Sequence, residues 1–207
     1  MLIIFDCDGV LRSVSWEAMY EAYLVIANYV NKDPADFWSD AHDFKIWHNN
    51  DWHFNLERMG IPKGSDYSVI SKMFHEIYDP RVYKFHWVED ILKCLSQRHT
   101  LAILSAAKAG SVRNSLDVSV NYFMCIKGVE HVEKIKPHPE GIHLIMDEAG
   151  ASADESLMIG DSHVDILAGK DAGVKTAGVT WGMEEADDLE KLDPDFLFHN
   201  PQQLKLL

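Results

Sequence analysis

The chain has 207 residues, of which 47% are hydrophobic and 25% charged, so it can build one domain with a sizeable core, or one domain that carries a small insert. Its formal net charge of −14, with no basic run, argues against binding of nucleic acid or of an anionic membrane surface. Three cysteines without a C-x-x-C pair, and no apolar stretch near the ~20 residues of a membrane span, lead us to expect a soluble cytoplasmic protein without disulfides.

The chain opens with an apolar run, Leu2 to Phe5, that leads directly into Asp6 and Asp8, with Gly9 behind them. An uninterrupted apolar run of this length predicts a strand that is buried on both faces. Two carboxylates one residue apart repel each other. A site at the end of this strand therefore requires a cation that offsets the repulsion.

No strand is expected in the next segment, residues 14–88. Its helical patterns lie at 15–31, at 33–60 with interruptions, and at 65–80. Because this segment is too long for a plain crossover between two strands, we interpret 14–88 as an inserted α-helical cap domain. The core domain would then consist of residues 1–13 and 89–207.

The stretch 45–55 of the expected cap is rich in aromatic and polar residues. We expect the side chains of Trp47, Trp52 and Phe54 in the cap core. The histidines of the stretch, His48 and His53, are expected at the cap surface. The alternative is that this stretch contributes contacts to a small polar phosphate ester.

Five more short apolar runs follow the insert, at 101–104, 123–126, 157–160, 175–180 and 195–198. Helical patterns at 111–118, 139–150 and 162–173 separate several of them. Strands that alternate with helices predict right-handed crossovers. The expected fold class is therefore α/β, with a doubly wound parallel sheet of Rossmann-like type and an inserted helical cap.

Polar residues follow several of these predicted strands or stand just before the next one. They are Asp6, Asp8, Ser105, Lys136, Asp161 and Asp165. Each has an ordinary structural explanation when taken alone, but the carboxyl ends of parallel strands meet at one edge of a sheet. Converging carboxylates need a cation, and hard oxygen ligands favour Mg²⁺. This set suits phosphoryl transfer, in which an aspartate can act as nucleophile and a second carboxyl can move a proton.

Four stretches resemble, in order, the four motifs of the haloacid dehalogenase superfamily: "FDCDGVL", "LAILSA", "KIKPHPEG" and "MIGDSHVDILAGKDAG". The "GVTWG" at 178–182 is also typical of its phosphoglycolate-phosphatase-like branch. The resemblance implies that Asp6 is the nucleophile and that Asp8 is the general acid and base. It further implies that Ser105 holds the transferring phosphoryl group and that Lys136 balances its charge. The implied Mg²⁺ ligands are Asp6, the backbone carbonyl of Asp8, Asp161 and Asp165, the last directly or through a water.

The resemblance implies a Mg²⁺-dependent phosphatase that acts on a small phosphorylated metabolite, of the phosphoglycolate or sugar-phosphate class, through an aspartyl-phosphate. The acid at Asp8 favours phosphatases and mutases over dehalogenating members, which lack it. One alternative is a phosphosugar mutase similar to β-phosphoglucomutase. Another, from a different class, is a phospho-accepting signalling domain, although the large insert argues against it.

The chain departs from the common motifs at three places. Val10 stands where a threonine is usual, and Ala106 where an asparagine often follows the serine. A common acidic residue is replaced around Arg12 and Ser13. We expect Val10 to pack, and Arg12 to be either an extra anion contact or a solvated arginine. These departures concern the substrate more than the reaction.

Overall fold

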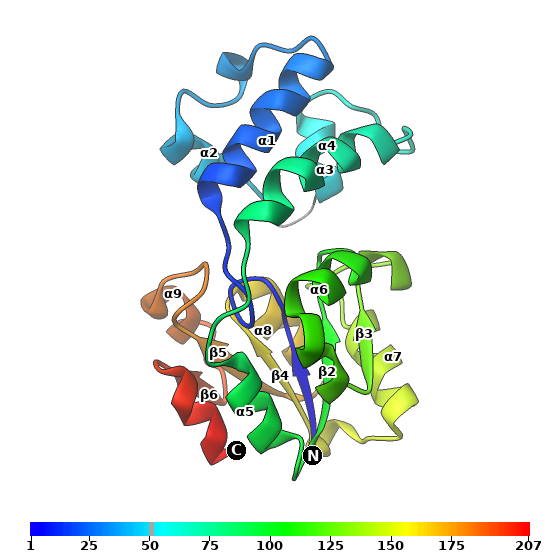
Figure 1. The fold of residues 1–207 in the computed structure, drawn as a ribbon, viewed down its shortest axis with the longest axis vertical. Helices are drawn as coiled ribbons and strands as arrows, with labels where there is room; N and C mark the ends of the chain where they lie inside the picture. Colours follow the sequence, from blue (N-terminus) through cyan, green and yellow to red (C-terminus); the bar gives the residue numbers. More distant parts are fainter. Residues whose placement is uncertain (50–51) are drawn as a thin grey trace. The chain divides into compact units, whose positions relative to one another are not determined.

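The structure, a computed structural model, describes residues 1–49 and 52–207. The chain divides into an α/β unit, Met1–Val14 with Tyr83–Leu207, and a helical unit, Ser15–Val82 (Figure 1). Residues 83–88, which the sequence placed with the insert, belong to the α/β unit. The reason is that Phe85 and Trp87 pack against its core, and the Phe85 amide donates to the Leu11 carbonyl at 3.1 Å.

The α/β unit is built on a six-stranded sheet in the order β3-β2-β1-β4-β5-β6, in which all neighbours are parallel. The strands are β1 (Leu2–Phe5), β2 (Thr100–Leu104), β3 (Cys125–Lys127), β4 (Ser156–Gly160), β5 (Lys175–Val179) and β6 (Phe196–Phe198). The predicted fold class is confirmed. The third strand begins later than expected, because a 3₁₀ helix occupies Asp117–Tyr122 and Phe123 packs edge-on against Phe5.

Helices cover both faces of this sheet (Figure 1). Side chains alternate along β1, so that Ile3 and Phe5 face one layer, and Leu2 and Ile4 face the other. The first layer includes α5 (Val88–Leu95) and α6 (Ala109–Leu116), and the second includes α7 (Glu140–Ala149) and α8 (His163–Asp171). Two helices were not predicted from the sequence, namely α5 and the short α9 (Ala186–Glu190). The remaining 3₁₀ turns of the unit are Val129–His131, Ala153–Glu155 and Pro201–Leu206.

The strand order positions the site. β1 lies between β2 and β4, and the order of connections reverses beside it. Ligands of doubly wound sheets bind outside the carboxyl ends of the strands at such a switch. The residues that follow β1, β2 and β4 are therefore neighbours, although the helical unit and several crossovers separate them along the chain.

The helical unit contains α1 (Trp16–Tyr29), α2 (Ala41–Trp47), α3 (Trp52–Arg58) and α4 (Ser68–Tyr78), with 3₁₀ turns at Pro34–Asp36 and Asp79–Arg81. The Ser15 hydroxyl caps α1 by accepting from the Ala18 amide at 3.2 Å. α1 packs along α4. Within residues 1–49 and 52–207, no helix has both the length and the apolar character that a membrane crossing needs.

Aromatic rings around Tyr23 fill the core of the helical unit. Trp47 and Trp52 both pack on that ring, with centroid distances of 5.9 and 5.7 Å, but both are half-buried, so they lie at the edge of the core and not fully inside it as expected. The prediction for Phe54 is wrong. Its side chain is 46% exposed and lies beside the Arg58 guanidinium.

The two histidines of the 45–55 stretch differ. His53 is exposed, as expected. The surface prediction for His48 is wrong, because its ring packs edge-on against Trp16 and Tyr23 at 5.6 and 5.8 Å. Burial lowers the pKa of His48 to about 4. Residues 50 and 51 of this stretch lie outside the described residues.

Candidate active site

Asp6 is held at the end of β1 by its own backbone. Its amide donates to the Ile159 carbonyl of β4 at 2.8 Å, so the first residue after the strand still belongs to the sheet. The chain then turns at Gly9, whose φ is +77°. A Cβ atom on Gly9 would lie 1.8 Å from Oδ2 of Asp161. Only glycine therefore allows this close approach of the β1 turn to a second carboxylate.

Asp161 follows β4 and is 1% exposed. Its Oδ2 accepts from the backbone amide of Met183 at 2.7 Å. The loop after β5 therefore also holds this carboxylate. Met183 was not predicted from the sequence, because a backbone donor leaves no side-chain signature.

Asp165 lies one turn further on, in α8, and is fully buried. Its Oδ2 accepts from the Ser162 hydroxyl at 2.7 Å and from the Ser162 amide at 3.2 Å. These bonds turn the other oxygen, Oδ1, towards Lys136. Both carboxylates that the fourth motif contributes are thus oriented by hydrogen bonds within α8 or the loop after β5.

The Lys136 ammonium bridges the site. It donates to Asp6 Oδ1 at 2.7 Å, to Asp165 Oδ1 at 2.6 Å and to the Leu104 carbonyl at the end of β2 at 3.1 Å. The loop that carries it is braced by Glu140, whose carboxylate accepts from the amides of Glu133 and Lys134. This brace was not predicted, although a glutamate in the first turn of α7 is its sign in the sequence.

Asp6, Asp161 and Asp165 form a buried cluster whose carboxylate oxygens lie within 4.8 Å of one another. Burial raises the pKa of Asp6 to about 7, although Lys136 acts in the opposite direction. Burial, followed by the two neighbouring carboxylates, raises the pKa of Asp161 well above its usual range. Burial acts to lower the pKa of Lys136, but Asp165 and Asp6 outweigh it and hold that pKa above its ordinary value.

These charges bear on the question of a metal. Three buried carboxylates stand against one lysine, so a bound cation would favour the ionised forms of Asp6 and Asp161, whose pKa values are raised without one. All of its side-chain donors to an ion are hard oxygens, which divalent cations such as Mg²⁺ prefer. The cluster is therefore chemically suited to hold a metal ion.

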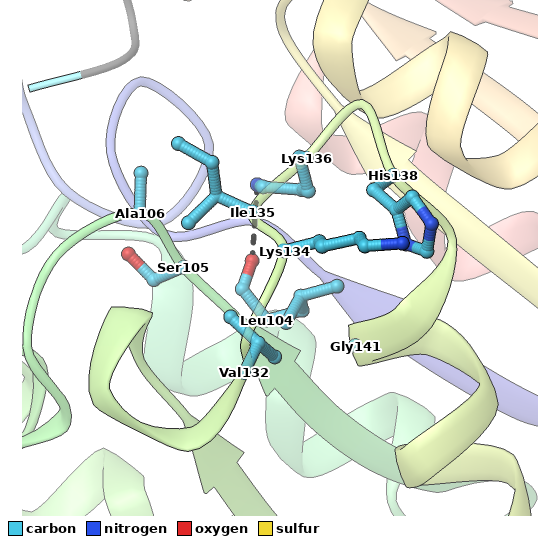
Figure 2. Close-up of a pocket in the computed structure, with 9 residues that line it drawn as sticks. All are labelled: Leu104, Ser105, Ala106, Val132, Lys134, Ile135, Lys136, His138 and Gly141. Carbon is cyan, nitrogen blue, oxygen red and sulfur yellow. Dashed lines mark hydrogen bonds between the residues drawn. The ribbon is translucent and has the colours of Figure 1, made fainter. Parts of the chain in front are cut away.

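Ser105 follows β2 and is 3% exposed. Its hydroxyl accepts from the Ala107 amide at 3.0 Å. Figure 2 shows it lining a small pocket together with Lys136 and residues of the third motif. The lining consists of Leu104, Ser105, Ala106, Val132, Lys134, Ile135, Lys136, His138 and Gly141. Ser105 and Lys136 thus come together as the sequence predicted, although the side chain of Ala106 offers no polar group there.

Asp8 does not belong to the three-carboxylate cluster. Both of its oxygens are engaged by Arg12, with Nε 2.9 Å from Oδ1 and Nη2 3.0 Å from Oδ2. Arg12 is 1% exposed, so the interpretation as a solvated arginine is wrong. The two residues stand four apart in the chain, and the turn that begins at Gly9 brings their side chains together.

The other residues of the first motif are structural. The Cys7 thiol is buried in the core, and burial raises its pKa well above the usual value, so it stays protonated. Val10 is fully buried, and its carbonyl accepts from the Trp181 indole at 3.2 Å. Val10 therefore packs, as expected, where a threonine is usual.

Comparisons with known proteins identify a family and several relatives. A family model described as haloacid dehalogenase-like hydrolase matches residues 3–179. Pyrophosphatase PpaX of Bacillus cereus is 32% identical over 208 residues, covering 98% of this chain and 93% of that protein. PpaX of Anoxybacillus flavithermus is 35% identical over 133 residues, which cover 63% of this chain. This match spans 62% of that protein, less than two thirds of its length.

Among solved structures, a haloacid dehalogenase-like family hydrolase from Streptococcus pneumoniae superposes with a TM-score of 0.77. The two chains are 20% identical, and the match covers 98% of this chain and 95% of the other. At this identity the likeness concerns the fold.

Proposed function

The chain belongs to the haloacid dehalogenase-like hydrolase family and is a phosphatase, and from that premise we propose that it hydrolyses a small phosphate monoester with the help of Mg²⁺, through an aspartyl-phosphate. The observation that carries the proposal is the Lys136 ammonium, which bridges Asp6 and Asp165 inside a buried carboxylate cluster. Under this proposal the α/β unit is the catalytic core and the helical unit is the inserted cap domain.

The metal would be held by Asp6, Asp161 and the backbone carbonyl of Asp8, with Asp165 binding it directly or through a water. Bound Mg²⁺ supplies positive charge that neutralises the phosphoryl oxygens and the carboxylates around them. The three buried carboxylates of the described cluster, which one lysine cannot balance when all are ionised, support this assignment.

In the first half of the reaction, a carboxylate oxygen of Asp6 attacks phosphorus. A bond between that oxygen and phosphorus forms while the ester P–O bond breaks. The carboxylic acid of Asp8 gives its proton to the departing alkoxide. The Ser105 hydroxyl and the Lys136 ammonium hold and neutralise the oxygens of the phosphoryl group in transfer.

In the second half, a water attacks phosphorus and gives a proton to the Asp8 carboxylate. The P–O bond to Asp6 breaks, which releases inorganic phosphate and regenerates the Asp6 carboxylate. Asp8 is then protonated again and ready for the next ester. The protons and electron pairs therefore balance over one cycle without another reactant.

The test is phosphate release by the purified chain with Mg²⁺. The panel contains p-nitrophenyl phosphate, 2-phosphoglycolate, hexose phosphates and inorganic pyrophosphate, the last because matched relatives are named pyrophosphatases. We expect release that EDTA abolishes and that Asp171→Asn, an exposed carboxylate at the end of α8, leaves unchanged. Full activity in EDTA would overturn the proposal. Interconversion of hexose phosphate isomers with little free phosphate would support the mutase alternative instead.

A further inference from the structure

Arg12 is a buried cation that the proposed mechanism does not use. It lies in the turn after β1, and its residue is 1% exposed. Its amide donates to the Cys7 carbonyl at 3.0 Å, and its carbonyl accepts from the Gly9 amide at 2.8 Å. The backbone of Arg12 is thus fixed within the loop that carries Asp6 and Asp8.

The guanidinium of Arg12 has two sets of partners. One edge, Nε and Nη2, meets both oxygens of Asp8 at 2.9 and 3.0 Å. The remaining nitrogen, Nη1, donates to the hydroxyls of Ser115 and Ser111 at 2.8 and 3.2 Å, and to the Ser111 carbonyl at 3.3 Å. Arg12 therefore connects the Asp8 carboxylate to α6.

This arrangement depends on the shape of the arginine side chain. A planar guanidinium can form two parallel bonds to a carboxylate while a third nitrogen faces elsewhere, which a lysine ammonium cannot do. Asp8 is 21% exposed at its side chain, so water competes for its oxygens. The two hydrogen bonds to a buried and anchored guanidinium restrict the rotation of the Asp8 carboxylate, although removing the Arg12 cation from water is unfavourable.

We infer that Arg12 is a positioning residue, which holds the Asp8 carboxylate in a single orientation by anchoring it to Ser111 and Ser115 of α6. The inference rests on the proposed function, because the orientation matters only where Asp8 moves a proton. A loosened Asp8 would impair proton transfer and leave substrate binding intact. Loss of Arg12 should therefore lower kcat much more than it changes KM.

A double-mutant cycle tests the inference, with Arg12→Gln, Asp8→Asn and the double variant assayed with Mg²⁺ and p-nitrophenyl phosphate. We expect Arg12→Gln to lower kcat by about 10- to 100-fold, with KM changed by less than about threefold. In the Asp8→Asn background, Arg12→Gln should change kcat by less than about threefold, because the group it positions is already gone. The exposed Arg113 on the same helix provides a matched control, Arg113→Gln, which should leave kcat unchanged.

Milder variants keep the test valid if Arg12→Gln does not fold. Ser115→Ala, and Ser111→Ala with Ser115→Ala, remove the hydroxyl part of the anchor but keep the arginine and the Ser111 carbonyl. We expect kcat to fall by about 2- to 10-fold, again only while Asp8 is present. Urea unfolding of Arg12→Gln, Asp8→Asn and the double variant should show coupling between positions 8 and 12.

Two results would overturn the inference. If Arg12→Gln lowers kcat equally in the wild-type chain and in the Asp8→Asn variant, and the wild-type chain is active, Arg12 only supports the fold. Absence of phosphate release by the wild-type chain from every substrate of the panel would overturn the proposed function, and this inference with it.

Discussion

The α/β unit and the helical unit both bury polar side chains, but they do so in opposite ways. At the sheet edge the buried groups are ionisable and of both signs, with Lys136 between Asp6 and Asp165. In the helical unit the buried polar groups are neutral. The amide of Asn55 donates to the Tyr23 hydroxyl at 3.0 Å and to the Asn49 carbonyl at 2.6 Å, and burial lowers the pKa of His48 to about 4.

The difference separates groups kept for chemistry from groups kept for packing. Burying a charge costs far more than burying a hydrogen-bonded amide, and clustering three carboxylates adds repulsion. Buried clusters of this kind are found at functional sites more often than elsewhere. The helical unit instead pairs the Asn55 amide by hydrogen bonds and packs aromatic rings around Tyr23. Four experiments test whether the buried polar groups of the two units differ in this way.

The largest effect is expected from Asp6→Asn. The substitution removes the proposed nucleophile, so phosphate release should fall by at least about 10³-fold. It also removes one of three repelling carboxylates, so the free energy of unfolding in EDTA should stay the same or rise. Phosphate release and urea unfolding of the same preparation measure both. A variant that keeps wild-type activity contradicts the role of Asp6.

Lys136→Met should destabilise the α/β unit. It leaves three buried carboxylates without their ammonium partner, and breaking a buried ion pair costs about 3–5 kcal/mol. Urea unfolding at pH 7 in EDTA measures the loss. Lys170→Met, at an exposed position of α8, is the matched control and should cost less than about 0.5 kcal/mol. Equal stability of the two variants would show that Lys136 does not balance the cluster.

The two units should respond to acid with opposite signs. The raised pKa of Asp6 means that the folded chain binds more protons than the unfolded chain between about pH 4 and 7, so stability is gained as the pH falls from 7 to 5. The lowered pKa of His48 means the reverse between about pH 6.5 and 4, so stability is lost over the same interval. Each contribution is about 2 kcal/mol between pH 7 and 5.

Variants separate these two contributions. On acidification in EDTA, Asp6→Asn should lose about 2 kcal/mol relative to the wild-type chain, and His48→Phe should gain about as much. Urea unfolding at pH 7, 6 and 5 provides the measurement. Parallel pH curves for the wild-type chain and either variant would show that the group in question does not titrate as described.

The smallest effect is expected from Asn55→Leu in the helical unit. It leaves the Tyr23 hydroxyl and the Asn49 carbonyl without the amide that donates to them, at a cost of about 1–3 kcal/mol. Asn28→Leu, at an exposed position of α1, serves as the control. Because this polar network is structural, kcat on p-nitrophenyl phosphate should change by less than about twofold. A large fall in kcat without loss of stability would place Asn55 among the functional residues.

Much of the α/β unit was predictable from local patterns. Short apolar runs marked all six strands within a few residues, because strands buried on both faces must be continuously apolar. The convergence of Asp6, Ser105, Lys136 and Asp161 followed from the rule that parallel strands end at one edge. The helix α5 escaped prediction because its eight residues directly follow the long helical insert, and no turn signal between them was recognised.

The sequence by itself therefore determined the strands, the sheet type and the acidic edge, since these depend on hydrophobic periodicity and chain direction. Tertiary structure decided the anchoring of Arg12 on Ser115 of α6, the bond from the Met183 amide to Asp161, and the packing of His48 against Trp16 and Tyr23. Each of these depends on side-chain rotamers or on backbone donors from a distant loop. Such contacts form between surfaces that only the folded chain brings together, and no local spacing encodes them.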